Sequence, residues 1–209
     1  GLRHAFDIDH LAAVSAIMPN HKKTIKKSSL LGLFWGFGHS IALLAVGLIV
    51  LLLKIKISER MALFFELIVA VMLIALGINV LFAIKKEKIH IHRHRHGNIE
   101  HIHLHSHKSA SHHLHEHAQL KKSLIIGLAH GLAGSAALTL LILTEIDSTI
   151  LGLIYIMLFG LGSMLGMILV SAIISLPFKL ISYKLQATQK LLRVGTGLIS
   201  IIIGLIILI

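Results

Sequence analysis

The sequence predicts an all-α protein, a polytopic bundle of transmembrane helices with about six spans. Hydrophobic residues make up 56% of the 209 residues, charged residues only 14%, and the mean hydropathy is +0.87. A soluble domain of this length carries more charge and fewer apolar residues. Long apolar runs alternate with short lysine-rich segments, which is the pattern of helices that cross a bilayer. We therefore expect a multi-pass membrane protein whose main surroundings are lipid.

The composition also excludes several classes of protein. The chain has no cysteine, so disulfides and thiolate metal sites are excluded. Its formal net charge is +11, but the basic residues lie between apolar runs, which indicates membrane topology rather than nucleic-acid binding. We find no glycine-rich phosphate loop and no nucleophile with a matching base, so we do not expect an enzyme.

The apolar runs give the expected elements in order. Residues 1–18 begin within an apolar segment that is shorter than the roughly 20 residues of a full span, so we expect the chain to be truncated at its N-terminus. The later spans are expected at residues 28–53, 61–84, 123–144, 149–176 and from 191 onward.

A weak internal repeat divides the chain. GLRH at residues 1–4 is echoed by GLAH at 127–130, and GFGHS at 36–40 by GLGS at 160–163. We expect a first three-helix repeat over 1–84, a His-rich loop over 85–122 and a second three-helix repeat over 123–209. An odd number of spans inverts the second copy, which in transporters places the site between the repeats. The basic loops, including the His-rich one, are expected to face the cytoplasm.

The opening string RHAFDIDH carries four ionisable residues, His4, Asp7, Asp9 and His10. An aspartate inside a membrane helix costs about 2.5–3.5 kcal/mol on insertion scales, so two of them need a function. In one continuous helix, His4, Asp7 and His10 would share a face and Asp9 would point to a neighbouring one. Imidazole and carboxylate together suit nickel, cobalt or zinc.

Two further histidines lie within apolar runs. His39 occurs in GLFWGFGHSIALL and His130 in GLAHGLAGSAAL, both among small residues that allow close helix packing. A structural imidazole bonded to a backbone carbonyl is the alternative for each. Asn79, Glu66 and Ser163 are weaker candidates.

The loop between the repeats contains twelve histidines within 28 residues. They are His90, His92, His94, His96, His101, His103, His105, His107, His112, His113, His115 and His117. Such a segment binds divalent metals by affinity order rather than by fixed geometry. We interpret it as an accessory metal buffer or sensor and not as the transport site.

RHAFDIDH and the Gly38-His39-Ser40 step resemble the motifs of the nickel/cobalt transporter family, in particular its shorter members related to urease-accessory H-type membrane proteins. The resemblance implies that the first-helix His and Asp residues bind metal during transport in a prokaryotic cytoplasmic membrane. It implies Ni²⁺ or Co²⁺ as substrate, with no permanently bound cofactor. It also implies a cytoplasmic metallochaperone or a urease or hydrogenase maturation protein as partner.

The leading hypothesis is a secondary transporter of Ni²⁺ or Co²⁺, in either direction, whose site consists of His4, Asp7, Asp9, His10 and His39 with His130 from the inverted half. A first alternative is a membrane-bound nickel reservoir or accessory protein that supplies a metalloenzyme. A second is a haem protein with His39 and His130 as axial ligands.

Overall fold

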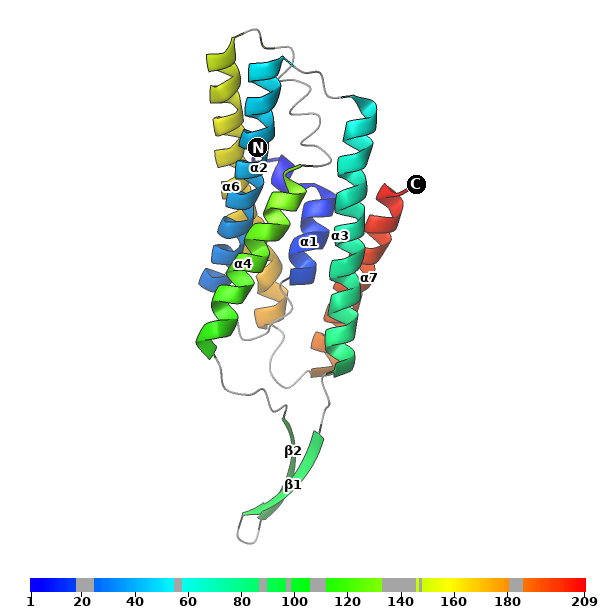
Figure 1. The fold of residues 1–209 in the computed structure, drawn as a ribbon. Helices are drawn as coiled ribbons and strands as arrows, with labels where there is room; N and C mark the ends of the chain where they lie inside the picture. Colours follow the sequence, from blue (N-terminus) through cyan, green and yellow to red (C-terminus); the bar gives the residue numbers. More distant parts are fainter. Residues whose placement is uncertain are drawn as a thin grey trace.

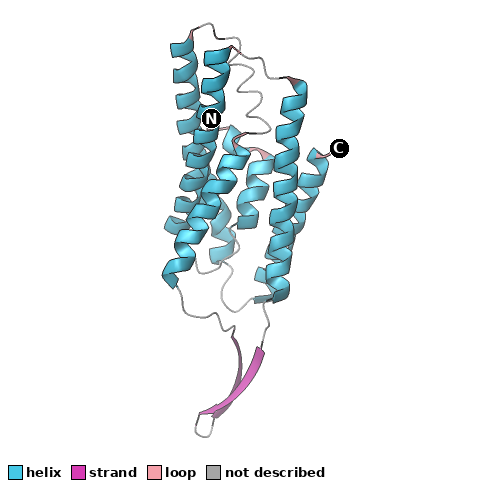
Figure 2. Cartoon of the chain, in the orientation of Figure 1, coloured by secondary structure: helices cyan, strands magenta, loops and turns pink. Residues whose placement is uncertain are grey.

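Six α-helices form the body of the protein in a computed structural model, which describes residues 1–17, 25–54, 58–86, 90–96, 99–105, 112–132, 146, 148–180 and 186–209. The elements are η1 (His4–Phe6), α1 (Ile8–Ile17), α2 (Ile25–Leu53), α3 (Glu59–Lys86), β1 (His90–His96), β2 (Ile99–His105), α4 (His112–His130), α6 (Thr149–Leu180) and α7 (Gln186–Ile207). The helices lie side by side, and the two strands form a separate hairpin (Figures 1 and 2).

Four of the described helices are long and apolar enough to cross a membrane. These segments are Ile25–Leu53, Glu59–Lys85, Thr149–Pro177 and Thr188–Ile207, with 20 to 29 residues each. A hydrocarbon core of about 30 Å requires about 20 residues. Their outward side chains are largely aliphatic and exposed, as expected for a lipid-facing surface. The helical fold and the membrane character predicted from the sequence are confirmed.

The short helix α1 lies inside the bundle. α2 packs mainly against α6 and α3 against α7, while α1 contacts α3, α6 and α7 (Figure 1). Ala12, Ala13 and Ala16 of α1 are at most 5% exposed, and such small side chains allow the surrounding helices to approach closely. This packing holds the charged residues at the start of α1 within the apolar bundle.

One end of the bundle is rich in lysine, and we call it the lysine end. Lys26 and Lys27 lie where α2 begins, Lys85 near the end of α3, and Lys121 and Lys122 in the middle of α4. α1, α3 and α6 run toward this end, whereas α2, α4 and α7 run away from it (Figure 1).

The His-rich segment differs from the predicted loop. β1 and β2 pair in an antiparallel register, with His90 opposite His105, His92 opposite His103 and His94 opposite His101. Histidine at every second position has the period of a strand, which explains why this segment can form a ladder. α4 already begins at His112 instead of near residue 123, so the last histidines of the predicted loop are helical. Residues 133–144 of the fourth expected span lie outside the described part of the chain.

Candidate metal centre

The opening motif is not one continuous helix, so the predicted face of His4, Asp7 and His10 is wrong. η1 ends at Phe6, and Asp7 takes an extended conformation, with φ −61° and ψ 149°, before α1 begins at Ile8. The carbonyl of Asp7 accepts a bond from the Leu11 N–H at 3.0 Å, which opens α1. Aspartate suits such a helix start. The break leaves the Asp7 side chain 39% exposed and turns Asp9, at 14%, toward the interior.

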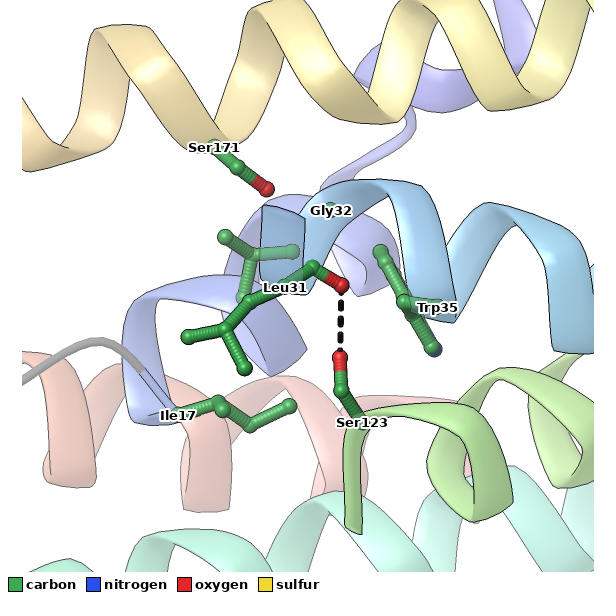
Figure 3. A pocket seen from close by; sticks show the side chains of 7 residues that line it. Ile17, Leu31, Gly32, Trp35, Ser123 and Ser171 are labelled. Carbon is green, nitrogen blue, oxygen red and sulfur yellow. Dashed lines mark hydrogen bonds between the residues drawn. The ribbon is translucent and has the colours of Figure 1, made fainter. Parts of the chain in front are cut away.

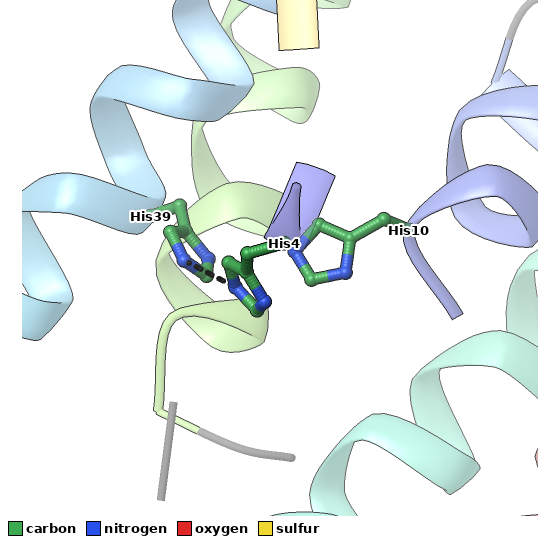
Figure 4. Close-up of side chains that lie close together, drawn as sticks. All are labelled: His4, His10 and His39. Carbon is green, nitrogen blue, oxygen red and sulfur yellow. Dashed lines mark hydrogen bonds between the residues drawn. The ribbon is translucent and has the colours of Figure 1, made fainter. Parts of the chain in front are cut away.

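Three imidazoles from three elements meet inside the bundle. His4 comes from η1, His10 from α1 and His39 from α2, and they are 7%, 1% and 1% exposed (Figure 4). The His4 ring centroid lies 4.4 Å from that of His10 and 5.0 Å from that of His39. The Nε2 atoms of His4 and His39 are 3.1 Å apart. One ligand atom from each ring lies within 4.8 Å of the others, so the three can share an ion.

A second group of possible ligands shares His10 with the first. Asp9 accepts hydrogen bonds from His10 Nδ1 at 3.1 Å and from His130 Nε2 at 3.0 Å. His130, at the end of α4, is 0% exposed, and ligand atoms of the three residues also lie within 4.8 Å of one another. The structure thus brings His130 to the opening motif across 121 positions of sequence.

The carboxylates determine which ring nitrogens face the interior. An ionised carboxylate only accepts hydrogen bonds, so neutral imidazoles must donate to it. His4 therefore donates from Nδ1 to Asp7 at 2.9 Å, and His10 donates from Nδ1 to Asp9. Both keep a lone pair on Nε2. This carboxylate–histidine arrangement is the one that orients imidazoles toward metals in proteins.

Buried nitrogen atoms without partners mark the same place. His10 Nε2, His39 Nδ1 and His130 Nδ1 are buried and have no hydrogen-bond partner among the described residues. Leaving a buried polar atom unpaired costs about 1–3 kcal/mol. A cation bound among these rings would use the lone pairs that otherwise remain unsatisfied.

Close packing at two glycines brings α4 to this position. A Cβ atom on Gly131 would overlap the carbonyl oxygen of His39, and one on Gly127 would overlap the carbonyl oxygen of Trp35. Only glycine, which lacks this atom, allows α4 to lie so close to α2. The small residues around His130 therefore position it relative to His39.

The remaining predicted residues lie elsewhere. Asn79 is exposed, Glu66 is half-buried and Ser163 is buried, and none of the three belongs to either ligand group. His90–His105 belong to β1 and β2, His112–His117 open α4, and His107 lies outside the described residues. The two axial ligands of the haem alternative, His39 and His130, fall in different ligand groups, and both have the His10 ring as a neighbour, with centroids at 5.3 and 4.4 Å.

Sequence reasoning missed Trp35, which contacts two rings of this centre without belonging to either ligand group. Its ring centroid lies 5.1 Å from that of His10 and 5.2 Å from that of His130, and the residue is 1% exposed. The available signal was its position: it is the sole tryptophan of the chain and stands one helical turn before His39.

Comparison with known proteins gives two findings. The family model described as "High-affinity nickel-transport protein" matches residues 1–209. The chain is also 37% identical, over 98% of its length and 85% of the relative's, to a protein named "Urease accessory protein UreH" from Bacillus sp. (strain TB-90). No solved structure matches the chain. Both descriptions concern nickel transport or urease accessory proteins rather than catalysis, in agreement with the sequence prediction of a protein that is not an enzyme.

Proposed function

The chain belongs to the high-affinity nickel-transport protein family, and on that premise we propose that it moves Ni²⁺ across a membrane through the buried His and Asp cluster. The observation that carries this proposal is the set of three buried, unpartnered ring nitrogens, on His10, His39 and His130. Imidazole nitrogen is a good ligand for nickel and cobalt. In an apolar bundle such groups favour a cation that arrives without its full water shell.

The spacing of the His4 and His39 rings suits one ion. The Nε2 atoms of His4 and His39 are 3.1 Å apart. Two nitrogens bound to one metal at about 2.0–2.1 Å lie about 2.9–3.4 Å apart when the angle at the metal is about 90–110°. An ion can therefore bridge these rings with small side-chain movements and no shift of η1 or α2, once the proton that His39 Nε2 donates to His4 has moved to the unpartnered Nδ1 of His39.

Asp7 and Asp9 take different roles in the proposed cycle. Asp9 lies in a ligand group with His10 and His130, so it can bind the ion directly or hold both rings in place. Asp7 holds His4 from the side that faces away from His39. Because His10 belongs to both ligand groups, the ion can pass from one group to the other without leaving all its ligands.

The cluster is proposed to lie between two inverted halves, residues 1–84 and 123–209, joined by the His-rich segment 85–122 on the cytoplasmic side. Two observations support this. Corresponding helices pack against each other, α2 on α6 and α3 on α7. The ligands come from both halves, His4 from the first and His130 from the second. In inverted-repeat transporters the site lies at this interface.

Nickel flux into proteoliposomes tests the proposal. We expect saturable Ni²⁺ flux with the wild type and none with the double variant His4→Ala, Asp9→Ala. The control is His117→Ala, an exposed histidine on α4 outside both ligand groups. Competition by Co²⁺ and Zn²⁺ ranks the substrates, and flux in oriented vesicles gives the direction. Equal flux in the wild type and the double variant would refute a site at these residues.

A second candidate is a membrane-bound nickel reservoir that supplies a metalloenzyme, such as a urease, through a cytoplasmic metallochaperone or maturation protein. The name of the Bacillus relative and the His-rich segment favour it. Deleting residues 90–105 separates the two functions while leaving α4 intact. A transporter keeps its flux after this deletion, whereas a reservoir loses most of its bound nickel.

A further inference from the structure

Apolar side chains lie on both sides of the histidines along α2 and α6. Toward the lysine end, Trp35 belongs to one apolar cluster with Val14, Leu31 and Ile126. Toward the opposite end, Phe159 packs against a second cluster that includes Leu43. An ion that has left its ligands is extremely unfavourable in apolar surroundings. The apolar side chains around Trp35 and those around Phe159 are therefore barriers on the two sides of the histidines.

Trp35 stands at the boundary between the cluster and the lysine end. One side of its ring contacts His10 and His130, with centroids at 5.1 and 5.2 Å. The residue also lines a small cavity of about 10 Å³ with Ser123 and Ser171 (Figure 3). This volume is about the minimum for one water molecule. The indole ring thus touches the histidines and also a small, mainly apolar cavity with two serines in its lining, of which Ser123 already donates to the Leu31 carbonyl.

Phe159 occupies the corresponding place on the other side. Its ring centroid lies 5.2 Å from that of His4, and its next aromatic neighbour is Tyr155 at 6.4 Å. Phe159 is ten residues into α6, which starts at the end opposite the lysine end, just as Trp35 is ten residues into α2. Each aromatic ring therefore lies at the same number of residues from the start of its own helix.

The contacts of the two rings correspond under the internal repeat. The alignment of GFGHS with GLGS pairs Trp35 with Phe159, and that of GLRH with GLAH pairs His4 with His130. Trp35 contacts His130, and Phe159 contacts His4, in both cases at 5.2 Å. Each half thus places an aromatic ring against the motif histidine of the other half.

Glycine contacts repeat in the same manner. A Cβ on Gly127 would overlap the carbonyl oxygen of Trp35, and one on Gly1 that of Phe159. Three further contacts each have a counterpart in the other half. The contact of Gly38 with Leu128 matches that of Gly162 with Leu2, and the contact of Gly36 with Met164 matches that of Gly160 with Ser40. The contact of Gly131 with Ala42 matches that of Gly166 with Ala5. In all four pairs, a contact made by one half recurs with the roles of the two halves exchanged. Trp35 and Phe159 therefore occupy related positions in the fold.

We propose that Trp35 and Phe159 are the two gates of the transport path, Trp35 toward the lysine end and Phe159 toward the opposite end. The proposal rests on the proposed nickel transport and adds the residues that close the site on each side. Movement of the Trp35 ring joins the histidines to the Ser123 and Ser171 cavity, while Phe159 stays closed over His4. The inverted halves supply the reverse arrangement, in which Phe159 opens and Trp35 closes.

Fluorescence tests the placement of the gates without requiring flux. Trp35 is the only tryptophan, so its emission reports on one gate, and the double variant Trp35→Phe, Phe159→Trp moves the fluorophore to the other. With protein oriented in vesicles, we expect iodide, which does not cross the bilayer, to quench the wild type only from the lysine-end face. Quenching should be limited to molecules whose Trp35 gate is open, because the closed ring is 1% exposed and its cavity has room for about one water molecule. The double variant should be quenched only from the opposite face. Quenching of both proteins from the same face, or of neither from any face, would overturn the proposal.

Alanine variants test gating itself, and they decide the matter if the swapped variant does not fold. Trp35→Ala and Phe159→Ala keep all proposed ligands, so we expect nickel affinity within about threefold of the wild type, a difference below 1 kcal/mol. Each should lose concentrative accumulation, because one barrier is missing and preloaded nickel leaks out. Phe37→Ala on α2 and Leu158→Ala on α6, at 49% and 65% exposed, are the lipid-facing controls.

The outcomes separate the two proposals. Wild-type accumulation that both alanine variants retain would overturn the gates and leave nickel transport standing. A wild type that neither binds nor moves nickel would overturn the proposed transport. The iodide experiment would then still show whether positions 35 and 159 are accessible from opposite faces of the membrane.

Discussion

The hydrogen bonds of Asp9 lead to a quantitative prediction for the substitution Asp9→Asn. The Asp9 carboxylate accepts one bond from His10 and one from His130, at 3.1 and 3.0 Å, and its side chain is 14% exposed. An asparagine amide offers one acceptor oxygen and one donor nitrogen. It can accept from one ring, but the nitrogen that faces the other ring N–H is itself a donor. One imidazole must therefore change its tautomer or rotate.

The expected loss follows from these two bonds. A hydrogen bond to a charged group contributes about 1.5–3 kcal/mol, and each 1.4 kcal/mol corresponds to a factor of ten in affinity. Replacing the charge weakens one bond and removes the other, so we expect nickel affinity to fall about 30- to 100-fold. This agrees with the 10- to 100-fold effects seen when groups that orient metal-binding histidines are changed.

Asp7→Asn is the matched control for this prediction. Asp7 makes one bond to His4, and its side chain is 39% exposed, so solvent screens its charge. We expect the affinity to fall less than about fivefold, which is about 1 kcal/mol. Equilibrium dialysis with radiolabelled nickel on purified protein in detergent measures both variants. An Asp9→Asn protein that binds nickel as tightly as Asp7→Asn does would refute this account of the centre.

Three further predictions concern pH, packing and the His-rich hairpin. Nickel affinity should fall as pH decreases, because a protonated imidazole has no lone pair for the metal, and dialysis at several pH values measures this. Gly127→Ala should lower unfolding stability by about 1–3 kcal/mol, since its Cβ would overlap Trp35. Gly195→Ala, where nothing lies within 4 Å, should not lower it, and thermal unfolding in detergent compares the two. Deleting residues 90–105 should leave nickel flux intact and reduce the amount of nickel bound per protein. Flux that disappears with this deletion would contradict a site confined to the bundle.

The sequence was sufficient to predict a helical membrane protein and to nominate the residues of the cluster. Apolar runs and basic loops predict spans directly, because the bilayer imposes their length and composition. Ionisable residues such as Asp9 and His39 are conspicuous in these runs because burial there is costly. The repeat of GLRH and GLAH further linked His4 with His130, which the structure places around the shared neighbour His10.

Two features could not be predicted from the sequence in the same way. The break at Asp7 depends on the ψ angle of one residue, in a segment where η1 packs against α6. A continuous helix was equally compatible with the local sequence. In such a helix Asp7 would face the ligands and Asp9 would point away, which is the reverse of what the structure has. Trp35 and Phe159 were missed because an aromatic residue in an apolar span has the composition of ordinary packing. Only their contacts with histidines distinguish them.

The bond between Asp9 and His130 has a consequence for the biogenesis of the protein. Its partners are 121 positions apart, and the bond joins the first half of the chain to the second. During synthesis the first helices emerge and enter the membrane before His130 exists, so a chain that is half inserted cannot form the complete centre. Nickel then gains its full set of ligands only after both halves have assembled, and by mass action it stabilises the assembled protein over the partly inserted one. The transported ion therefore also stabilises the association of the two halves of the protein.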